Sequence, residues 1–438
     1  MQATNRRVQI MAKDTSKALR NLVIYQIFVR NFSKEGTFLA IIPELDRIKS
    51  LGADAIWLAP IHPTGEKNRK GSLGSPYAIK DYRATNPEYG TIEDFAALSD
   101  EIHRRGIKLM IDVVYNHTSP DSVLAKTHPE WFYHKADGSL GNHVGDWSDV
   151  VDLEYTNTEL WDYQIETLCY WAKYVDGFRC DVASMVPVEF WQKARAQVEK
   201  VRPGCIWLAE TVHPIFITEH RKRGINVLSD SEILQAFDIS YDYDIFADFT
   251  DFVKGKAPLS HYAECVNRQE YTYPDNYIKL RFLENHDVPR ARALFPDIKA
   301  LKNATAFNYF QKGTTLIYAG EEAAVSHVPG LFDKDDVIWD SDETVDLSGL
   351  LYRLYEIKKN PVFTDSAYHL TAMPNDIILG VHESFGKKAV GIFSMRGNDG
   401  PVSVGLPDGT YENLIDQSPV KVTDGKIASK GDPIIIIS

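Results

Sequence analysis

The chain has 438 residues, more than one ordinary hydrophobic core needs, so we expect one large domain and a smaller one. Hydrophobic residues make up 44% and charged residues 25% of it, the mixture of a globular protein. The formal net charge of −13 argues against nucleic acid, an acidic substrate or an anionic membrane surface as partners, because each would need a basic face. We therefore expect a neutral ligand.

The N-terminal stretch MQATNRRVQIMAKDTSK is basic and polar, and it has no apolar core of signal-peptide length. No run approaches the roughly 20 apolar residues of a membrane span. The cysteines show neither a disulfide framework nor a zinc-binding spacing. They are Cys169, Cys180, Cys205 and Cys265. These features predict a cytoplasmic protein that binds no membrane.

Eight short apolar runs alternate with amphipathic stretches of helical period. Continuous apolar strands separated by helices pair in parallel and have both faces covered. Eight such units predict an α/β fold of the (β/α)8 TIM barrel type. The runs span residues 21–29, 53–61, 107–115, 174–182, 205–210, 237–245, 277–285 and 313–321.

Two stretches depart from the barrel pattern. The polar stretch 119–160, which contains Gly and Trp, is too long for a turn and predicts a small lobe inserted after the third strand. From residue 362 to 438, short alternating runs with turns predict a C-terminal antiparallel β-domain. The barrel is then expected to comprise residues 1–118 and 161–361.

Polar residues gather where the predicted strands end, and in such barrels the active site lies at the C-terminal ends of the strands. A lone carboxylate at a strand end is most often a helix cap, but four strands that end this way favour an active site. These residues are Asp112, Asn116 and His117 for the third strand, Arg179 and Asp181 for the fourth, Glu210 for the fifth, and Glu284, His286 and Asp287 for the seventh.

Two of these carboxylates suit the cleavage of a glycosidic bond, in which one group attacks or activates water and the other protonates the leaving oxygen. Arg179 and Asp181 share one face of a strand, so we expect an ion pair that lowers the pKa of Asp181 and keeps it ionised. Glu210 follows an apolar strand and faces other carboxylates, so we expect a raised pKa and a protonated acid. A retaining mechanism would place the two carboxyl groups about 5–5.5 Å apart.

Four segments make a specific family resemblance. DVVYNH, GFRCDV, AET after an apolar strand, and FLENHD resemble, in the same order, the four signature segments of the α-amylase family of retaining glycoside hydrolases. IWLAPIHPTG, SPYAIKDYRATNPEYGT and VVDLEYTN resemble further segments of that family. The resemblance extends over residues 20–340 and implies a barrel with a C-terminal β-domain that acts on α-glucosidic bonds.

The resemblance implies roles position by position. Asp181 matches the nucleophile that forms a covalent glycosyl intermediate, Glu210 the general acid/base, and Asp287 the third carboxylate, which binds ring hydroxyls. Asp112 matches a structural member of the first segment. The implied substrate-binding residues are Tyr77, His117, Arg179, which holds the nucleophile, and His286.

The sequence also departs from the family pattern. Ser184 and Met185 stand where the second segment often has Lys-His, and NFSKEGTF lacks the Asp-x-Asn-x-Asp loop of a family calcium site. Asn116 is the one candidate calcium ligand, so we expect no required cofactor. Val182, after the expected nucleophile, is found in family members that act on α-1,6 bonds.

Other polar and aromatic residues receive plainer interpretations. We expect a solvated or capping role for Asp238, Asp242 and Asp244, capping or surface exposure for Glu321 and Glu322, and loop packing for His62. For aromatic residues of the lobe, sugar stacking and a small core are equally favoured. They are Trp131, Phe132, Trp147 and Trp161.

The expected function is hydrolysis of α-glucosidic bonds in maltodextrins or related α-glucans through a glycosyl-Asp intermediate. A first alternative keeps the site but is an α-glucan transglycosylase or disaccharide isomerase, in which a sugar accepts the intermediate. A second is a catalytically inactive binding protein, and a third is a metal-dependent hydrolase that uses the His and Asp residues as ligands. The sequence does not indicate an oligomeric state.

Overall fold

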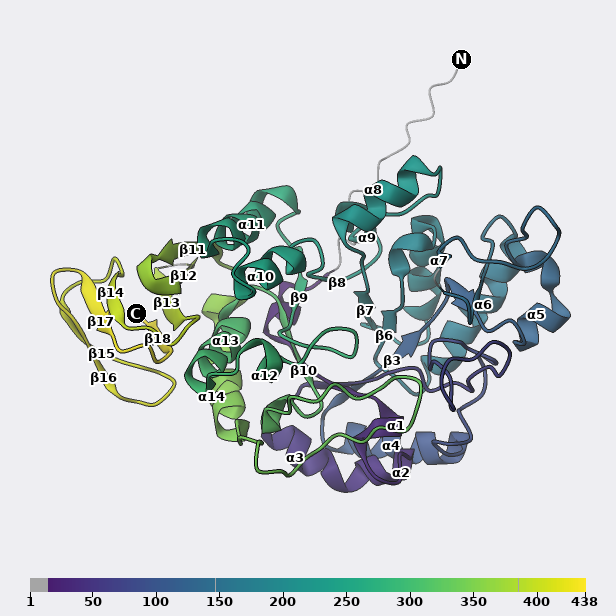
Figure 1. Cartoon of the computed structure of the whole chain (residues 1–438), viewed down its shortest axis with the longest axis horizontal. Helices are drawn as coiled ribbons and strands as arrows, with labels where there is room; N and C mark the ends of the chain where they lie inside the picture. The colour runs from purple at the N-terminus through teal and green to yellow at the C-terminus, as the bar shows by residue number, and fades with distance from the viewer. Residues whose placement is uncertain (1–14, 146, 385) are drawn as a thin grey trace, which may run out of the picture.

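The structure, a computed structural model, describes residues 15–145, 147–384 and 386–438 (Figure 1). Most of the polar N-terminal stretch, residues 1–14, therefore lies outside the described part. Among the described residues, no helix combines the length and the apolar character needed to cross a bilayer.

A closed barrel of eight parallel strands forms the centre of the molecule, in the order β1-β10-β9-β8-β7-β6-β3-β2. All eight predicted apolar runs contain one of these strands, so the predicted barrel is confirmed. The strands are β1 (Val23–Ile27), β2 (Ala55–Leu58), β3 (Lys108–Val113), β6 (Gly177–Cys180), β7 (Ile206–Ala209), β8 (Ile239–Tyr241), β9 (Lys279–Arg281) and β10 (Thr314–Tyr318). Nearly every strand residue is buried, as expected for parallel strands covered on both faces.

Helices surround the barrel (Figure 1). Helix α4 shows how the sequence sets their ends: Thr91 and Asp94 form a reciprocal capping box, and Gly106, with φ of +71°, follows its last turn. The helices are α1 (Val29–Phe32), α2 (Phe38–Ile41), α3 (Leu45–Ser50), α4 (Ile92–Arg104), α6 (Thr158–Trp171), α7 (Val188–Val198), α8 (Pro214–Lys222), α9 (Asp230–Ile233), α10 (Phe246–Val253), α11 (Leu259–Thr272), α12 (Ala291–Leu294), α13 (Ile298–Phe310) and α14 (Ser348–Lys358).

The stretch between β3 and α6 forms the predicted lobe. It contains the short antiparallel pair β4 (His117–Thr118) and β5 (Val151–Asp152), and helix α5 (Val123–Thr127). Trp131 and Phe132 are buried in its core. This lobe extends from the same end of β3 that carries the polar residues, so it can supply a wall to a site there.

The C-terminal domain is antiparallel throughout, and it lies on the opposite side of the barrel from α5 (Figure 1). Its strands are β11 (Ala367–Met373), β12 (Ile377–Ser384), β13 (Lys387–Ser394), β14 (Gly400–Ser403), β15 (Gly409–Glu412), β16 (Pro419–Val422), β17 (Lys426–Ser429) and β18 (Ile434–Ile437). Strands β11, β12, β13 and β18 form one sheet, which packs on α13 through the ring of Phe310. Gly380 and Gly391 make room for this ring, because a Cβ at either position would lie within 3 Å of it.

Candidate active site

A cleft of about 420 Å³ opens at the C-terminal ends of the barrel strands. Five of the seven predicted catalytic and substrate-binding residues line it: Tyr77, His117, Asp181, Glu210 and Asp287. The other two lie directly behind its wall. Arg179 is fully buried and contacts Asp181 and Glu210, and His286 is 4% exposed and contacts Tyr77 and Asp287. The fold therefore brings all seven predicted residues together.

Arg179 is the centre of the site. Its Nη1 donates to Asp181 Oδ1 at 2.8 Å and to Asp112 Oδ1 at 2.9 Å, and its Nη2 forms an ion pair with Glu210 Oε1 at 3.0 Å. The predicted ion pair between Arg179 and Asp181 is thus confirmed. The planar guanidinium also lies 5.3–5.7 Å from the centres of the rings of Trp57, Tyr77 and Tyr241. A lysine ammonium lacks the rigid, planar set of donors that lets one arginine bind several carboxylates in fixed directions.

One buried cation faces three carboxyl groups, and this imbalance sets their protonation. Burial raises the pKa of Glu210 to about 8 against the attraction of Arg179, and the charges of Asp181 and Asp287 raise it further. The predicted direction for Glu210 is therefore confirmed. Burial likewise raises the pKa values of Asp181 and Asp112, so the three carboxyl groups share their protons rather than titrate independently.

The predicted lowering of the pKa of Asp181 is wrong. Burial raises it to about 7, and the nearby charge of Asp112 adds to this, while Arg179 opposes both. The prediction assigned the whole guanidinium charge to Asp181, but Arg179 also faces Asp112 and Glu210. The spacing of residues within one strand predicts the pair of Arg179 and Asp181, but it does not predict the partners of Arg179 that come from other strands.

Val182 has a backbone role that the sequence did not reveal. It adopts the left-handed conformation, with φ of 41° and ψ of 41°, which a β-branched side chain rarely accepts. In this conformation its N–H donates to Glu210 Oε2 at 2.8 Å. The strained turn thus fixes the carboxyl group of Glu210 beside Asp181, and strain of this kind concentrates at functional sites.

The two predicted sugar-binding histidines are neutral. Burial lowers the pKa of both His117 and His286 to about 4. An amide N–H donates to Nδ1 of each ring, from Asn116 at 3.1 Å and from Gln26 at 2.7 Å, which leaves the proton on Nε2. The Nε2 atoms lie 3.8 Å from Asp181 Oδ2 and 3.1 Å from Asp287 Oδ2, respectively. His117 lines the cleft and can therefore present an N–H donor to a hydroxyl-rich ligand, whereas Nε2 of His286 already contacts the hydroxyl of Tyr77.

Tyr77 completes the inner wall of the cleft. Its ring is stacked on that of His286, with 5.4 Å between the ring centres, and its hydroxyl donates to Asp112 Oδ2 at 3.2 Å. The ring is thereby held in a fixed orientation at the cleft surface. A fixed aromatic face of this kind suits the apolar face of a sugar ring.

Further residues of the cleft wall come from loops that the sequence interpretation did not connect with the site. Trp147 of the lobe lies with its ring 5.4 Å from that of His117, so it belongs to the cleft, whereas Trp161 packs against Phe190. Lys70 pairs with Asp149 at 3.0 Å. The wall also includes Ser75, Val150, Thr211, Val212, His213, Phe216, Tyr243, Val288, Leu331 and Phe332. Among these wall residues, only Trp147 had a signal in the sequence, through the tryptophan content of the lobe.

Comparison with known proteins gives the family of the chain. The family model described as alpha amylase, catalytic domain, matches residues 13–139 and 125–360, well over half of the sequence. The chain belongs to the α-amylase family. A second model, the bacterial alpha amylase C-terminal domain, matches residues 369–436, where the structure has its antiparallel β-domain.

Relatives in the α-amylase family cover the chain to different extents. A solved α-amylase from Lactobacillus plantarum is 48% identical, with a TM-score of 0.94 over 97% of this chain and 100% of that one. An α-amylase of Haloarcula japonica is 26% identical over 89% of this chain. An α-1,4-glucan:maltose-1-phosphate maltosyltransferase of Rhodospirillum rubrum is 32% identical over 57% of it. The chain spans 57% and 36% of the lengths of these last two proteins.

The residues around Asn116 do not fit the calcium ion that some α-amylases hold. Calcium takes six to eight oxygen ligands. The side-chain amide of Asn116 donates to His117, Asp152 Oδ2 accepts from His143, and Asp149 pairs with Lys70. Oδ1 of Asp152 is buried without a partner, but one oxygen does not make a cage.

The solvated or capping role predicted for Asp238, Asp242 and Asp244 is wrong. Asp238 is buried and pairs with Arg195 at 2.6 Å. Asp242 pairs with Arg281 at 2.6 Å, and Asp244 pairs with Lys279 at 2.9 Å. Each basic partner lies on another element, distant in the sequence, so the pairing has no local signal.

Three glutamates at strand ends also lie outside the cleft wall. Glu284 pairs with Arg290 at 2.6 Å. The surface exposure predicted for Glu321 and Glu322 is wrong, because both are 3% exposed. Their carboxylates accept from the backbone N–H groups of Tyr318 and Gly320, respectively. His62 is buried in loop packing, as predicted.

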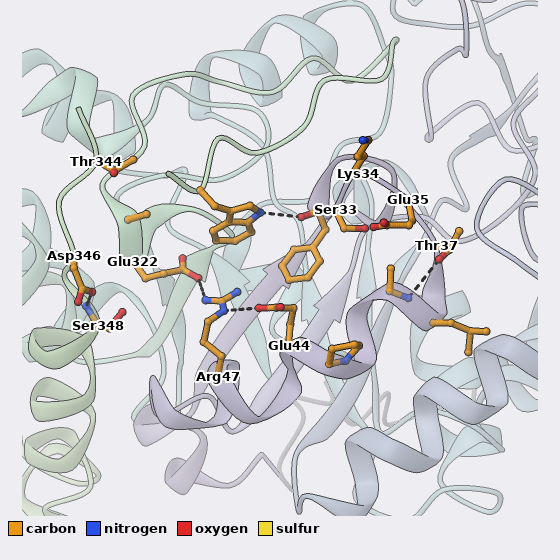
Figure 2. A pocket seen from close by; sticks show the side chains of 16 residues that line it. Ser33, Lys34, Glu35, Thr37, Glu44, Arg47, Glu322, Thr344, Asp346 and Ser348 are labelled. Atoms are coloured by element: carbon orange, nitrogen blue, oxygen red, sulfur yellow. Dashed lines mark hydrogen bonds and ion pairs between the residues drawn. The ribbon is translucent and has the colours of Figure 1, made fainter. Parts of the chain in front are cut away.

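A larger hollow, of about 940 Å³, lies elsewhere, between the α2–α3 region and the start of α14 (Figure 2). There Arg47 reaches across to Glu44 and Glu322, at 2.7 and 2.6 Å (Figure 2). None of the seven predicted residues lines this hollow. Size alone therefore does not mark the place where the polar strand ends converge.

Proposed function

We propose that the protein is a retaining α-glycosidase that hydrolyses α-glucosidic bonds in maltodextrins or related α-glucans. The observation that carries the proposal is the shared guanidinium of Arg179, which holds Asp181 and Glu210 side by side at the cleft surface. Adjacent carboxyl groups of unequal pKa supply both a nucleophile and an acid. Membership of the α-amylase family supports this substrate class.

In the first step, the carboxyl group of Glu210 gives its proton to the glycosidic oxygen while an oxygen of Asp181 attacks the anomeric carbon. The bond between that carbon and the leaving oxygen breaks, and a glycosyl ester of Asp181 forms. In the second step, Glu210 takes a proton from water, which attacks the same carbon and releases Asp181. Two inversions give net retention of the anomeric configuration, and no metal ion takes part.

The remaining predicted residues bind and orient the sugar in this proposal. Asp287, which lines the cleft beside His286, accepts from ring hydroxyls, and Tyr77 offers its ring face. Neutral His117 donates from Nε2, and neutral His286 holds Tyr77 and Asp287 in position. Contacts that tighten as the ring flattens toward the oxocarbenium-like transition state contribute to the rate.

A second candidate function is transfer of the glycosyl group from Asp181 to another sugar. The similarity over 57% of the chain to a protein named a maltosyltransferase favours it. The chemistry up to the glycosyl ester is the same, and only the acceptor differs. The competition between water and sugar for the ester depends on the shape of the cleft wall, which includes Trp147 and Phe216.

The test is incubation with a panel of α-1,4 and α-1,6 glucosides, with product sizes and anomeric form followed over time by chromatography and NMR. We expect shorter products that first appear as the α-anomer. Products longer than the substrate, or a rearranged disaccharide, would show transfer or isomerisation instead. First-formed β-anomer would contradict the retaining mechanism, and binding without turnover would indicate an inactive binding protein.

A chelator control addresses the metal-dependent alternative. Activity at a temperature well below unfolding should be the same with and without EDTA. Complete loss in EDTA, with recovery on adding a divalent cation, would overturn the proposed mechanism. The cytoplasmic location stays a prediction.

A further inference from the structure

Three side chains of different ligand type converge on the outer side of the barrel, where α10 meets α11. Asp248 Oδ1 lies 2.9 Å from His261 Nε2, and Cys265 Sγ lies 3.9 Å from the same nitrogen. One ligand atom from each residue lies within 4.8 Å of the other two. Among the described residues, no other group of three His, Cys, Asp or Glu side chains has ligand atoms arranged in this way.

The arrangement follows from the helices. His261 and Cys265 are four residues apart, so they share one face of α11. Asp248 reaches the same point from α10. A cavity of about 310 Å³ opens beside the three side chains, lined also by Asp244 and Arg268. It gives an ion and its water access to the ligands.

The ligand set suits zinc. A carboxylate, an imidazole and a thiolate bind Zn²⁺ at about 2.0–2.3 Å, so in a tetrahedral site their atoms lie about 3.3–3.7 Å apart. The two separations that involve His261, 2.9 and 3.9 Å, lie on either side of this range, and the carboxylate and the sulfur lie within 4.8 Å of each other, so rotamer adjustments of about an ångström bring the three together. Calcium and magnesium prefer oxygen ligands and are disfavoured by the sulfur and nitrogen.

We propose that Asp248, His261 and Cys265 form a zinc site, with a water molecule as the fourth ligand. Binding releases the thiol proton of Cys265 to solvent, and the His261 nitrogen that faces Asp248 binds the ion as a neutral ligand. Arg268, which is exposed and lies 3.1 Å from the sulfur, moves into the adjoining cavity as the ion takes its place.

The site has a structural consequence that is independent of the proposed function. None of its three residues lines the catalytic cleft. It ties α10 to α11, and α11 carries the C-terminal domain through Asn267, whose amide exchanges two hydrogen bonds of 2.8 Å with the backbone of Leu370. Zinc should therefore stabilise the fold and leave turnover unchanged.

The test uses the full chain freed of metal, with Co²⁺ as a spectroscopic probe and Zn²⁺ as the ligand. We expect one equivalent of Co²⁺ to give the charge-transfer absorption of a cobalt–thiolate bond, which Zn²⁺ then displaces. Zn²⁺ should also raise the unfolding temperature by roughly 2–5 °C. H261A and C265A should lose both effects.

Cys169→Ala is the matched control, because Cys169 is a partly exposed thiol outside the group and C169A should behave as the wild type. His261 is exposed, so H261A tests the site without disturbing the core. The proposal is overturned if the wild type shows no cobalt–thiolate absorption, if the absorption survives in H261A, or if zinc binds without raising the unfolding temperature.

Discussion

The barrel contains two buried networks of charged side chains, one beside the cleft and one away from it. In the first, Arg179 alone faces three carboxyl groups, and two of these open onto the cleft. In the second, Lys279 and Arg281 alternate with Leu280 along β9 and face α11 and α9. Both cations are fully buried there, and neither lines the cleft.

The second network is closer to balance. Lys279 pairs with Asp230 and Asp244, Arg281 pairs with Asp242, and Gln269 donates to Asp242 and Asp244 at 2.9 Å each. Burial pushes the pKa of Asp244 upward, but Lys279 and three hydrogen bonds outweigh it, and the net shift is downward. At Asp230 and Asp242 burial prevails and raises the pKa, as it does at Asp181, so Asp244 differs from its own neighbours in this respect.

The comparison shows what separates a working charge from a structural one in this protein. Both sets are buried and ion-paired, so burial and pairing alone do not identify an active site. The proposed catalytic set has one cation for three carboxyl groups, and two of these line the cleft. The structural set has two cations for three carboxylates and contributes nothing to the cleft wall, although Asp244 borders the smaller cavity beside α11.

The largest expected effect comes from changing Asp181, the proposed nucleophile, in the first network. Asp181→Asn should lower kcat by roughly 10⁴–10⁶-fold, because the amide cannot form the glycosyl ester. The unfolding temperature should not fall, since one of three crowded carboxyl groups loses its charge. Kinetics on a maltooligosaccharide and a thermal melt measure the two quantities. A loss below tenfold would refute the assigned role.

Breaking the second network should have the reverse result. Lys279→Met leaves Asp230 and Asp244 buried without their cation, so the free energy of unfolding should drop by about 3–5 kcal/mol. The kcat of the folded fraction should be unchanged. Denaturant unfolding and activity at low temperature check this prediction.

Lys193→Met is the matched control for this change. Its ion pair with Asp162, at 2.7 Å, has side chains that are 44% and 67% exposed, and such pairs contribute about 0–1 kcal/mol. If Lys279→Met costs no more than Lys193→Met, the distinction between the two networks fails.

The smallest expected effect concerns the way in which kcat/KM depends on pH. The proposed mechanism needs Asp181 ionised and Glu210 protonated. Activity should therefore fall as the pH drops below the pKa of Asp181, about 7, and fall again as the pH rises above that of Glu210, about 8. The expected profile is a narrow bell. Glu210→Gln should remove the alkaline limb from the residual activity, measured on a substrate with a good leaving group. An alkaline limb that persists in this variant would assign it to another group.

The sequence predicted the barrel, and it pointed to seven residues that the fold brings together, because both are encoded locally. Each strand is a short apolar run, and each predicted carboxylate or histidine follows or ends such a run. Gln26 and Lys70 were missed because their partners, His286 and Asp149, are remote in the chain. The zinc-site candidate was missed for the same reason, since the spacing of His261 and Cys265 is uninformative without Asp248 from the preceding helix.

The closure of the barrel has a consequence for synthesis on the ribosome. Strand β1 pairs with β10, where Val23 lies opposite Thr315. At about 5–20 residues per second, roughly 15–60 s separate the emergence of these two strands from the ribosome. Throughout that interval the nascent chain carries β1 with one edge unpaired, and such edges recruit other chains. Efficient production of this protein therefore depends on protection of its first strand until the last barrel strand arrives.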